Sequence, residues 1–176
     1  MSNYKEIVTK AVMGKGKKYF KSKYSVETGE KPSTILGCWI INHKFNGYER
    51  NDNVVVDGSF DINLWYSTDN DTKTNVINKT IKYNEEIAVK SKLDVDLSEG
   101  EVIVRALRQP TCSNATIDGN NISFDIEKEL GIEVVGDTKV KILTEDSDDE
   151  WQVFTDTVTE ETEKEIDEEV NEDFLE

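Results

Sequence analysis

The clearest alternation of apolar and polar positions lies near the middle of the chain. Phe60, Ile62 and Leu64 fall on one face of a predicted strand, while Asp61 and Trp65 fall on the opposite, polar face. Looser alternation, or an apolar run of strand length, recurs at residues 15–24, 35–45, 54–67, 74–83, 101–107, 115–117, 122–126 and 134–143. The pattern predicts a chain made mainly of short strands.

Turn-forming sequences separate these strands. Residues 46–47 and 118–121 have the Asn-Gly and Asp-Gly sequences of tight hairpins, and residues 69–71 form another turn. About eight strands with a turn roughly every 8–12 residues predict an antiparallel β-sandwich or a jelly-roll-like domain. The chain lacks βαβ alternation, which argues against Rossmann and TIM-barrel folds.

The start of the chain has a different pattern. Its apolar positions recur at helical spacing, so residues 3–12 are predicted to form a short amphipathic helix that ends near Gly14 and Gly16. A basic stretch with Tyr19 and Phe20 among lysines follows, and it forms a strand or an arm. We expect this start to pack on the body of the protein or on a second copy, through Tyr4, Ile7, Val8, Val12, Tyr19 and Phe20.

Charge divides the chain into three parts. Residues 1–24 hold seven Lys and one Glu, a net of +6, and residues 145–176 hold sixteen acidic residues and one Lys, a net of −15. Residues 1–144 together hold 21 acidic and 20 basic residues, a net of −1, so the overall charge of −16 describes the tail. We therefore predict a basic assembly arm (1–24), a β-sandwich domain (25–144) and an acidic tail (145–176).

The acidic tail is predicted to be disordered by itself, because its few apolar residues do not offset the entropy lost on ordering. Apolar residues recur every fourth position near its end, which favours a helix formed on a partner. The residues of the tail expected to contact partners are Glu145, Asp146, Asp148, Asp149, Glu150, Ile166, Val170 and Phe174. A solvated charge run is the simpler interpretation of the acidic cluster, and weak calcium binding is a poorer one.

The sequence gives no support for an enzyme. The single histidine, His43, ends an apolar strand and is interpreted as a surface or capping residue. No nucleotide-binding, hydrolase or zinc-protease motif is present, and Cys38 and Cys112 match no zinc spacing. We expect buried free thiols, no metal and no cofactor. The Asp and Asn residues at 69–71 are better explained as turn formers than as calcium ligands.

Other partner classes are also disfavoured. The lysines at 15–23 resemble a nucleic-acid footprint in composition, but the acidic tail would compete with phosphate. No secretory signal follows Met1 and no apolar run approaches a membrane span, so we expect a cytoplasmic protein. Trp39 and Tyr66 are predicted to be in the core. Trp65 lies on the polar face and is predicted to anchor a partner, or to form a sugar-binding platform with its neighbours.

Several segments resemble the outer spore coat protein E (CotE) family of endospore-forming bacteria. They match in order and cover about residues 1–143: residues 4–16, 31–43, 60–67, 72–74, 109–112 and 133–139. An acidic tail of variable sequence also fits this family.

The resemblance implies a non-enzymatic morphogenetic protein. Such a protein is made in the mother-cell cytoplasm, encases the forespore, self-associates and recruits other proteins into the spore coat. The family associates its N-terminal segment with self-assembly, which here is residues 4–24, and its acidic C-terminal region with recruitment, which here is residues 145–176. A β-sandwich that binds carbohydrate or the cell envelope, with Trp65 and Tyr66 as its platform, is the alternative.

Overall fold

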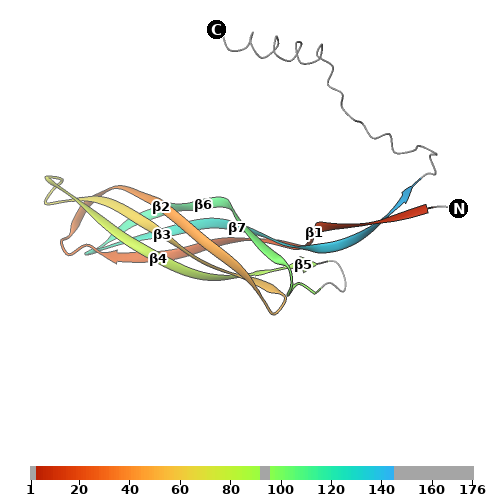
Figure 1. The fold of residues 1–176 in the computed structure, drawn as a ribbon. Coiled ribbons are helices and arrows are strands. Elements are labelled where there is room, and N and C mark those ends of the chain that lie inside the picture. The colour runs from red at the N-terminus through yellow and green to blue at the C-terminus, as the bar shows by residue number, and fades with distance from the viewer. Residues whose placement is uncertain (1–2, 92–95, 145–176) are drawn as a thin grey trace, which may run out of the picture. The chain divides into compact units, whose positions relative to one another are not determined.

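The computed structural model describes residues 3–91 and 96–144, which form strands joined by short turns (Figure 1). The strands are β1 (Asn3–Glu27), β2 (Pro32–Arg50), β3 (Asn53–Thr68), β4 (Lys73–Ala88), β5 (Lys90–Ser91), β6 (Glu101–Asp118) and β7 (Asn121–Thr144). Residues 6–140 form one compact unit. Residues 3–5 and 141–144 belong to a second unit.

The strands form two antiparallel sheets. One sheet has the order β2-β3-β4, a meander in which each strand pairs with the next along the chain. The other has the order β5-β1-β7-β6, in which β6 and β7 form a hairpin. The end of β1 meets the start of β7, where the Thr28 N–H donates to the Asn120 carbonyl at 2.9 Å.

A single core joins the two sheets. The three-stranded sheet contributes Phe60, Ile62 and Leu64 from β3, and the four-stranded sheet contributes Phe124 and Leu130 from β7. The alternation seen in the sequence therefore turns one face of each sheet inward, which is the arrangement of a β-sandwich. The predicted fold class, mainly β with antiparallel sheets, is confirmed.

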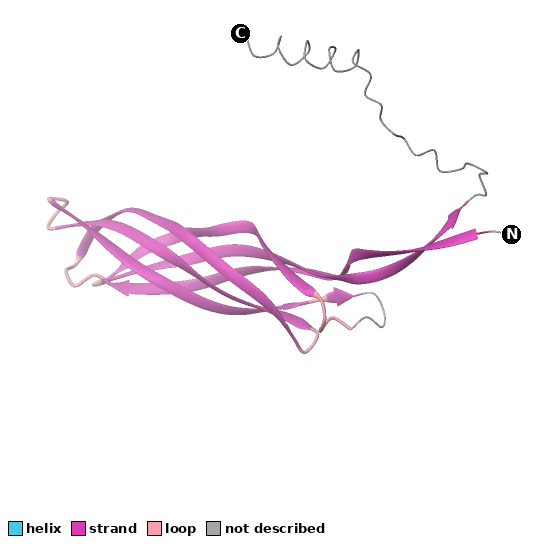
Figure 2. Ribbon diagram, in the orientation of Figure 1, coloured by secondary structure: helices cyan, strands magenta, loops and turns pink. Residues whose placement is uncertain are grey.

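The predicted N-terminal helix is wrong, because residues 3–12 belong to β1 and the described part of the chain contains no helix (Figure 2). Tyr4, Val8 and Val12 lie four residues apart, and this spacing fits one face of a strand as well as one face of a helix. β1 also continues without interruption through residue 24 to Glu27, so the second half of the predicted arm is part of the sandwich.

Two of the predicted turns are correct and one is wrong. Residues 69–71 and 118–121 connect neighbouring strands, with positive φ angles at Asp69, Asn70, Asp71 and Gly119. Residues 46–47 instead lie inside β2, and the turn follows at Asn51 and Asp52, whose φ angles are 53° and 63°. Gly47 instead leaves room for the side chain of Val104 on β6, which a Cβ at position 47 would overlap.

Candidate interaction surfaces

An apolar patch covers part of the outer face of the three-stranded sheet. Trp65 on β3 pairs with Gly37 on one side and with Val76 on the other. The Trp39 ring lies over Gly37, so the two tryptophans and Val76 form a row across three strands. The exposed fractions are 54% for Trp39, 40% for Trp65 and 41% for Val76. We call Trp39, Trp65 and Val76 the tryptophan patch.

The burial predicted from the sequence is correct for two of these three aromatic residues and wrong for the third. Trp65 is exposed, as its position on the polar face predicts, and its role as a partner anchor stays a prediction. Tyr66 is in the core, and its hydroxyl donates to the Thr28 carbonyl at 3.2 Å. Trp39 was predicted to be in the core, which is wrong. The strand that carries Trp39 is apolar on both faces, so its periodicity does not show which face is turned toward the core. The one available signal was Gly37, two positions earlier on the same face, which leaves room for the Trp39 ring.

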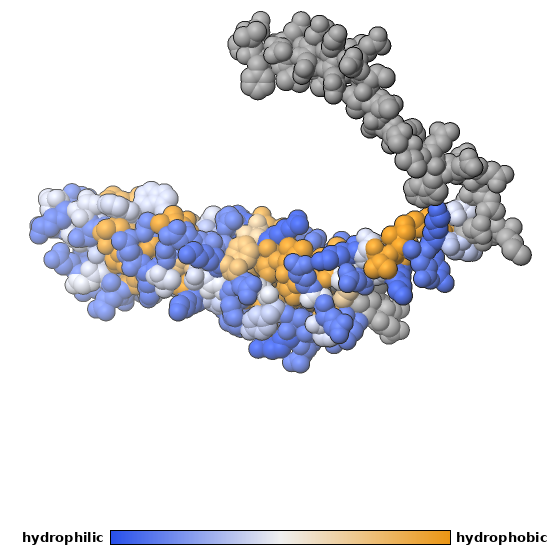
Figure 3. Space-filling view, viewed as in Figure 1, coloured by the Kyte–Doolittle hydropathy of each residue, from blue (hydrophilic) through white to orange (hydrophobic). Residues whose placement is uncertain are grey.

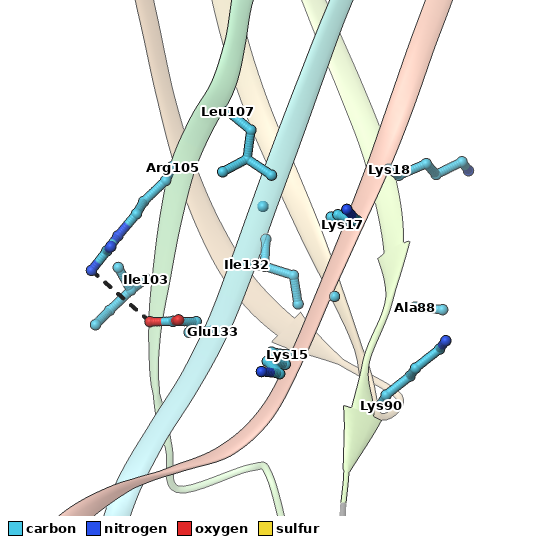
Figure 4. Close-up of a pocket in the computed structure, with 12 residues that line it drawn as sticks. Lys15, Lys17, Lys18, Ala88, Lys90, Ile103, Arg105, Leu107, Ile132 and Glu133 are labelled. Carbon is cyan, nitrogen blue, oxygen red and sulfur yellow. Dashed lines mark ion pairs between the residues drawn. The ribbon is translucent and has the colours of Figure 1, made fainter.

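A basic groove of about 730 Å³ lies on the four-stranded sheet (Figure 4). Ile103 and Leu107 give it apolar walls, and Leu107 lies 3.0 Å from the position that a Cβ at Gly131 would occupy. Its charged lining residues are Lys15, Lys17, Lys18, Lys90, Arg105 and Glu133, five positive and one negative, a net of +4. Arg105 and Glu133 are 4.0 Å apart. Such a groove suits an acidic chain segment.

The first half of β1, residues 6–13, carries exposed apolar side chains. Val8 is 66% exposed and Val12 is 52% exposed, and Ile7 is also exposed. Among the described residues, β5 pairs with β1 only at Gly14 and Lys15, and β6 pairs with β7 only up to Val135. The first half of β1 therefore has β7 as its one described neighbour in the sheet. Figure 3 shows how hydrophobic residues interrupt the hydrophilic surface on the face in view.

The remaining residues predicted for self-assembly are placed differently. Tyr4, in the second unit, is exposed. Tyr19 is exposed as well, and nearby Glu127 raises the pKa of its hydroxyl. Phe20 is only 8% exposed and packs in the core, so it is not available to a second copy. Its predicted contact with a partner is corrected, because even-numbered positions in this half of β1 face the opposite sheet.

An interior polar network lies above Phe20. Lys128 is 2% exposed, and its ammonium lies 3.1 Å from a Glu85 carboxylate oxygen. The same ammonium sits over two aromatic rings, 4.8 Å from the Phe20 centroid and 4.2 Å from the Tyr83 centroid. A buried ammonium requires such partners, because desolvation disfavours its charge. No sequence pattern indicates this network, since Lys128 is one of many charged residues in the chain.

His43 extends the network to the edge of the sandwich. Its Nε2 lies 2.7 Å from the Tyr83 hydroxyl, and its Nδ1 lies 3.0 Å from the Gln109 side-chain oxygen. Because that oxygen accepts, Nδ1 carries the proton and Nε2 accepts from Tyr83.

Burial and the Lys128 charge lower the pKa of His43, although the Gln109 hydrogen bond opposes this. Burial and Glu85 raise the pKa of Tyr83 to about 12. His43 is half-buried.

Other kinds of site find no counterpart in the described part of the chain. Within residues 3–91 and 96–144, no three His, Cys, Asp or Glu side chains are grouped to hold a metal ion. Those same residues include no helix long and apolar enough to span a membrane. The predicted partner residues at 145–150, 166, 170 and 174 lie outside the described residues.

The fold and surfaces of the described residues define a mainly β protein of two antiparallel sheets, with apolar and charged residues displayed on their outer faces. The family model described as outer spore coat protein E (CotE) matches residues 3–176, so the chain belongs to this family. It is therefore an outer spore coat protein. Comparisons with curated proteins and with solved structures found no significant match.

Proposed function

We propose that this outer spore coat protein is a morphogenetic scaffold, which self-associates around the forespore and recruits further coat proteins. The observation that carries the proposal is the exposure of apolar side chains on strands outside the core, in the first half of β1 and in the tryptophan patch. Exposed apolar patches of this kind mark protein contacts. The protein is made in the mother-cell cytoplasm before it enters the coat, and it acts without catalysing a reaction.

Self-association uses the first half of β1. Val8 and Val12 offer apolar side chains, and the strand edge offers backbone groups to a second copy. A two-stranded ribbon is only marginally stable in water, so contact with another copy would stabilise this part of the chain. The homo-oligomer is then built from the same contact in each copy.

Recruitment uses the tryptophan patch and the acidic residues 145–176. Tryptophan is enriched among the residues that dominate binding energy at protein interfaces. The acidic segment suits basic surfaces on other coat proteins. Contacts between these exposed charges weaken with salt, because screening at 0.1 M salt acts beyond about 10 Å.

The proposal is tested by comparing the full chain with a chain that ends at Thr144, which keeps β7 whole. Light scattering should give the same large particles for both, whereas the chain that ends at Thr144 should retain fewer other coat proteins than the full chain in a pull-down from a spore coat extract. A monomeric full chain would overturn the scaffold, and loss of particles on truncation would overturn the separation of roles. Deleting residues 1–24 is a poor test because it removes Phe20 from the core.

A second candidate function is carbohydrate or envelope binding. The adjacent exposed rings of Trp39 and Trp65 favour it, since a sugar ring stacks on such a surface. Tyr66, predicted as part of the platform, is buried and does not contribute. Glycan titration followed by tryptophan fluorescence separates the two functions: a scaffold gives no response, and a saturable response abolished in Trp39→Ala favours the sugar-binding module.

A further inference from the structure

The two cysteines of the chain meet across the sandwich. Cys38 lies on β2 and Cys112 lies on β6, so each sheet supplies one thiol. Both are half-buried, and both pack against the common core. The two thiols lie close enough for each to shift the pKa of the other. Sequence spacing gave no reason to pair them, because the strands that carry them are not neighbours along the chain.

The contact belongs to a continuous seam between the edge strands of the two sheets. Along this seam Gly47 lies against Val104, and His43 contacts Gln109 at 3.0 Å. Positions rise along β2 as they fall along β6, from Cys38 beside Cys112 to Gly47 beside Val104. The strands are therefore antiparallel, although they belong to different sheets.

This arrangement matches what a disulfide requires. A disulfide needs two Cβ atoms roughly 3.5–4.5 Å apart, and the seam brings both cysteine side chains against the same core from facing strands. Two thiols that already face each other across this seam need only a small approach. Both are only partly covered, so a small reagent can reach the pair.

We propose that Cys38 and Cys112 form an intramolecular disulfide that locks the seam between the two sheets when the protein meets a small-molecule disulfide such as oxidised glutathione. The lock is independent of the scaffold function, because it lies within one copy of the chain. It would hold the two layers of the sandwich together after the protein leaves a reducing environment.

The reaction is two successive thiol–disulfide exchanges. The Cys112 thiol loses its proton to water, and the thiolate attacks one sulfur of oxidised glutathione, whose S–S bond breaks and releases one glutathione thiolate. The Cys38 thiol then loses its proton to water, and its thiolate attacks the Cys112 sulfur, so that the S–S bond of the mixed disulfide breaks and releases the second glutathione thiolate; the two released thiolates take up the two protons. Two protein thiols are oxidised, and one glutathione disulfide is reduced to two thiols, so electrons and protons balance.

The interaction between the two thiols sets the order of attack. Proximity of the Cys38 thiol lowers the pKa of Cys112, because it stabilises the Cys112 thiolate. The same interaction, together with burial, raises the pKa of Cys38. Cys112 is therefore the thiol that reacts first, and Cys38 is the one that resolves the mixed disulfide.

The test uses the full chain, treated with oxidised glutathione and measured by intact mass under denaturing, non-reducing conditions. We expect a monomer that has lost two hydrogen atoms, a cross-linked Cys38–Cys112 peptide after digestion, and a Tm higher by about 10 °C because the bridge closes a long loop. The reducing agent dithiothreitol should reverse the Tm change. Two glutathione adducts per chain, a disulfide between two chains, or unreacted thiols would each overturn the proposal.

Single serine variants separate the two steps. Cys38→Ser should stop at one glutathione adduct on Cys112, and Cys112→Ser should form its adduct more slowly. The double variant Cys38→Ser/Cys112→Ser is the control for the Tm change and should not respond to the oxidant. A Cys112→Ser protein that reacts as fast as Cys38→Ser would overturn the assigned order of attack.

Discussion

The two halves of β1 have similar residues but different surroundings. In the second half, Phe20 and Val26 face the opposite sheet and are buried. In the first half, Val8 and Val12 alternate in the same way along the strand and remain exposed. Alternation therefore makes both halves a strand, whereas burial depends on whether a second layer covers the apolar face. The uncovered half is the one that has apolar surface left for a partner.

The largest effect expected from this difference is the loss of a buried ring. Phe20→Ala should lower the free energy of unfolding by about 3–5 kcal/mol, because it leaves a cavity beneath Lys128. Val12→Ala, in the exposed half, should change it by less than about 1 kcal/mol. Urea unfolding of both variants measures the contrast. Equal losses would mean that the two halves are packed alike.

A smaller effect is expected where the buried half meets the interior network. Glu85→Gln should cost about 2 kcal/mol in the free energy of unfolding, since it removes the charge that partners the buried Lys128 ammonium. The expected loss of stability is smaller than for a fully buried ion pair, because Glu85 remains partly exposed. Glu86→Gln is the matched control: Glu86 is exposed and 4.0 Å from Arg50, so its change should be within about 1 kcal/mol. The reverse ranking would contradict the assigned role of Lys128.

The network should also make stability depend on pH. The pKa of His43 in the folded protein lies below its unfolded value of about 6.5, so the folded state binds fewer protons in the window between the two values. The contribution of His43 is therefore complete above pH ~6.5 and is lost as pH falls toward the folded pKa, by less than about 1.4 kcal/mol per pH unit. Thermal unfolding between these values measures the slope, and His43→Gln should remove it. An unchanged slope in His43→Gln would assign it to other groups.

Sequence patterns predicted those parts of the fold that depend on local rules. The alternation around Phe60 correctly predicted which face of β3 is buried. The turn residues at 69–71 and 118–121 correctly predicted two connections between strands. The same rules failed where a distant segment decides the outcome. Gly47 accommodates Val104 from another strand instead of forming a turn, and residues 3–12 carry a spacing that fits helix and strand equally.

The candidate surfaces show the same limit. Trp65 was identified because an aromatic residue on a polar face is visible in the pattern, and it is exposed. Trp39 and Phe20 were misplaced, since an apolar strand without alternation, or a ring among lysines, does not show which sheet will cover it. The Lys128 network and the Cys38–Cys112 contact join strands that are remote in sequence. They depend on the three-dimensional arrangement and had no local signal.

The smallest change in stability should accompany a large change in assembly. Val8→Thr with Val12→Thr keeps side-chain shape and strand preference, so on an exposed face it should alter the free energy of unfolding by about 0.5 kcal/mol or less per site. It also places hydroxyl groups on the surface proposed for self-association, so light scattering should show smaller particles or monomers. Val76→Thr, a similarly exposed valine in the tryptophan patch, is the matched control and should leave particle size unchanged. If Val76→Thr disrupts the particles and the β1 variant does not, self-association depends on the tryptophan patch and the uncovered half of β1 is not the assembly surface.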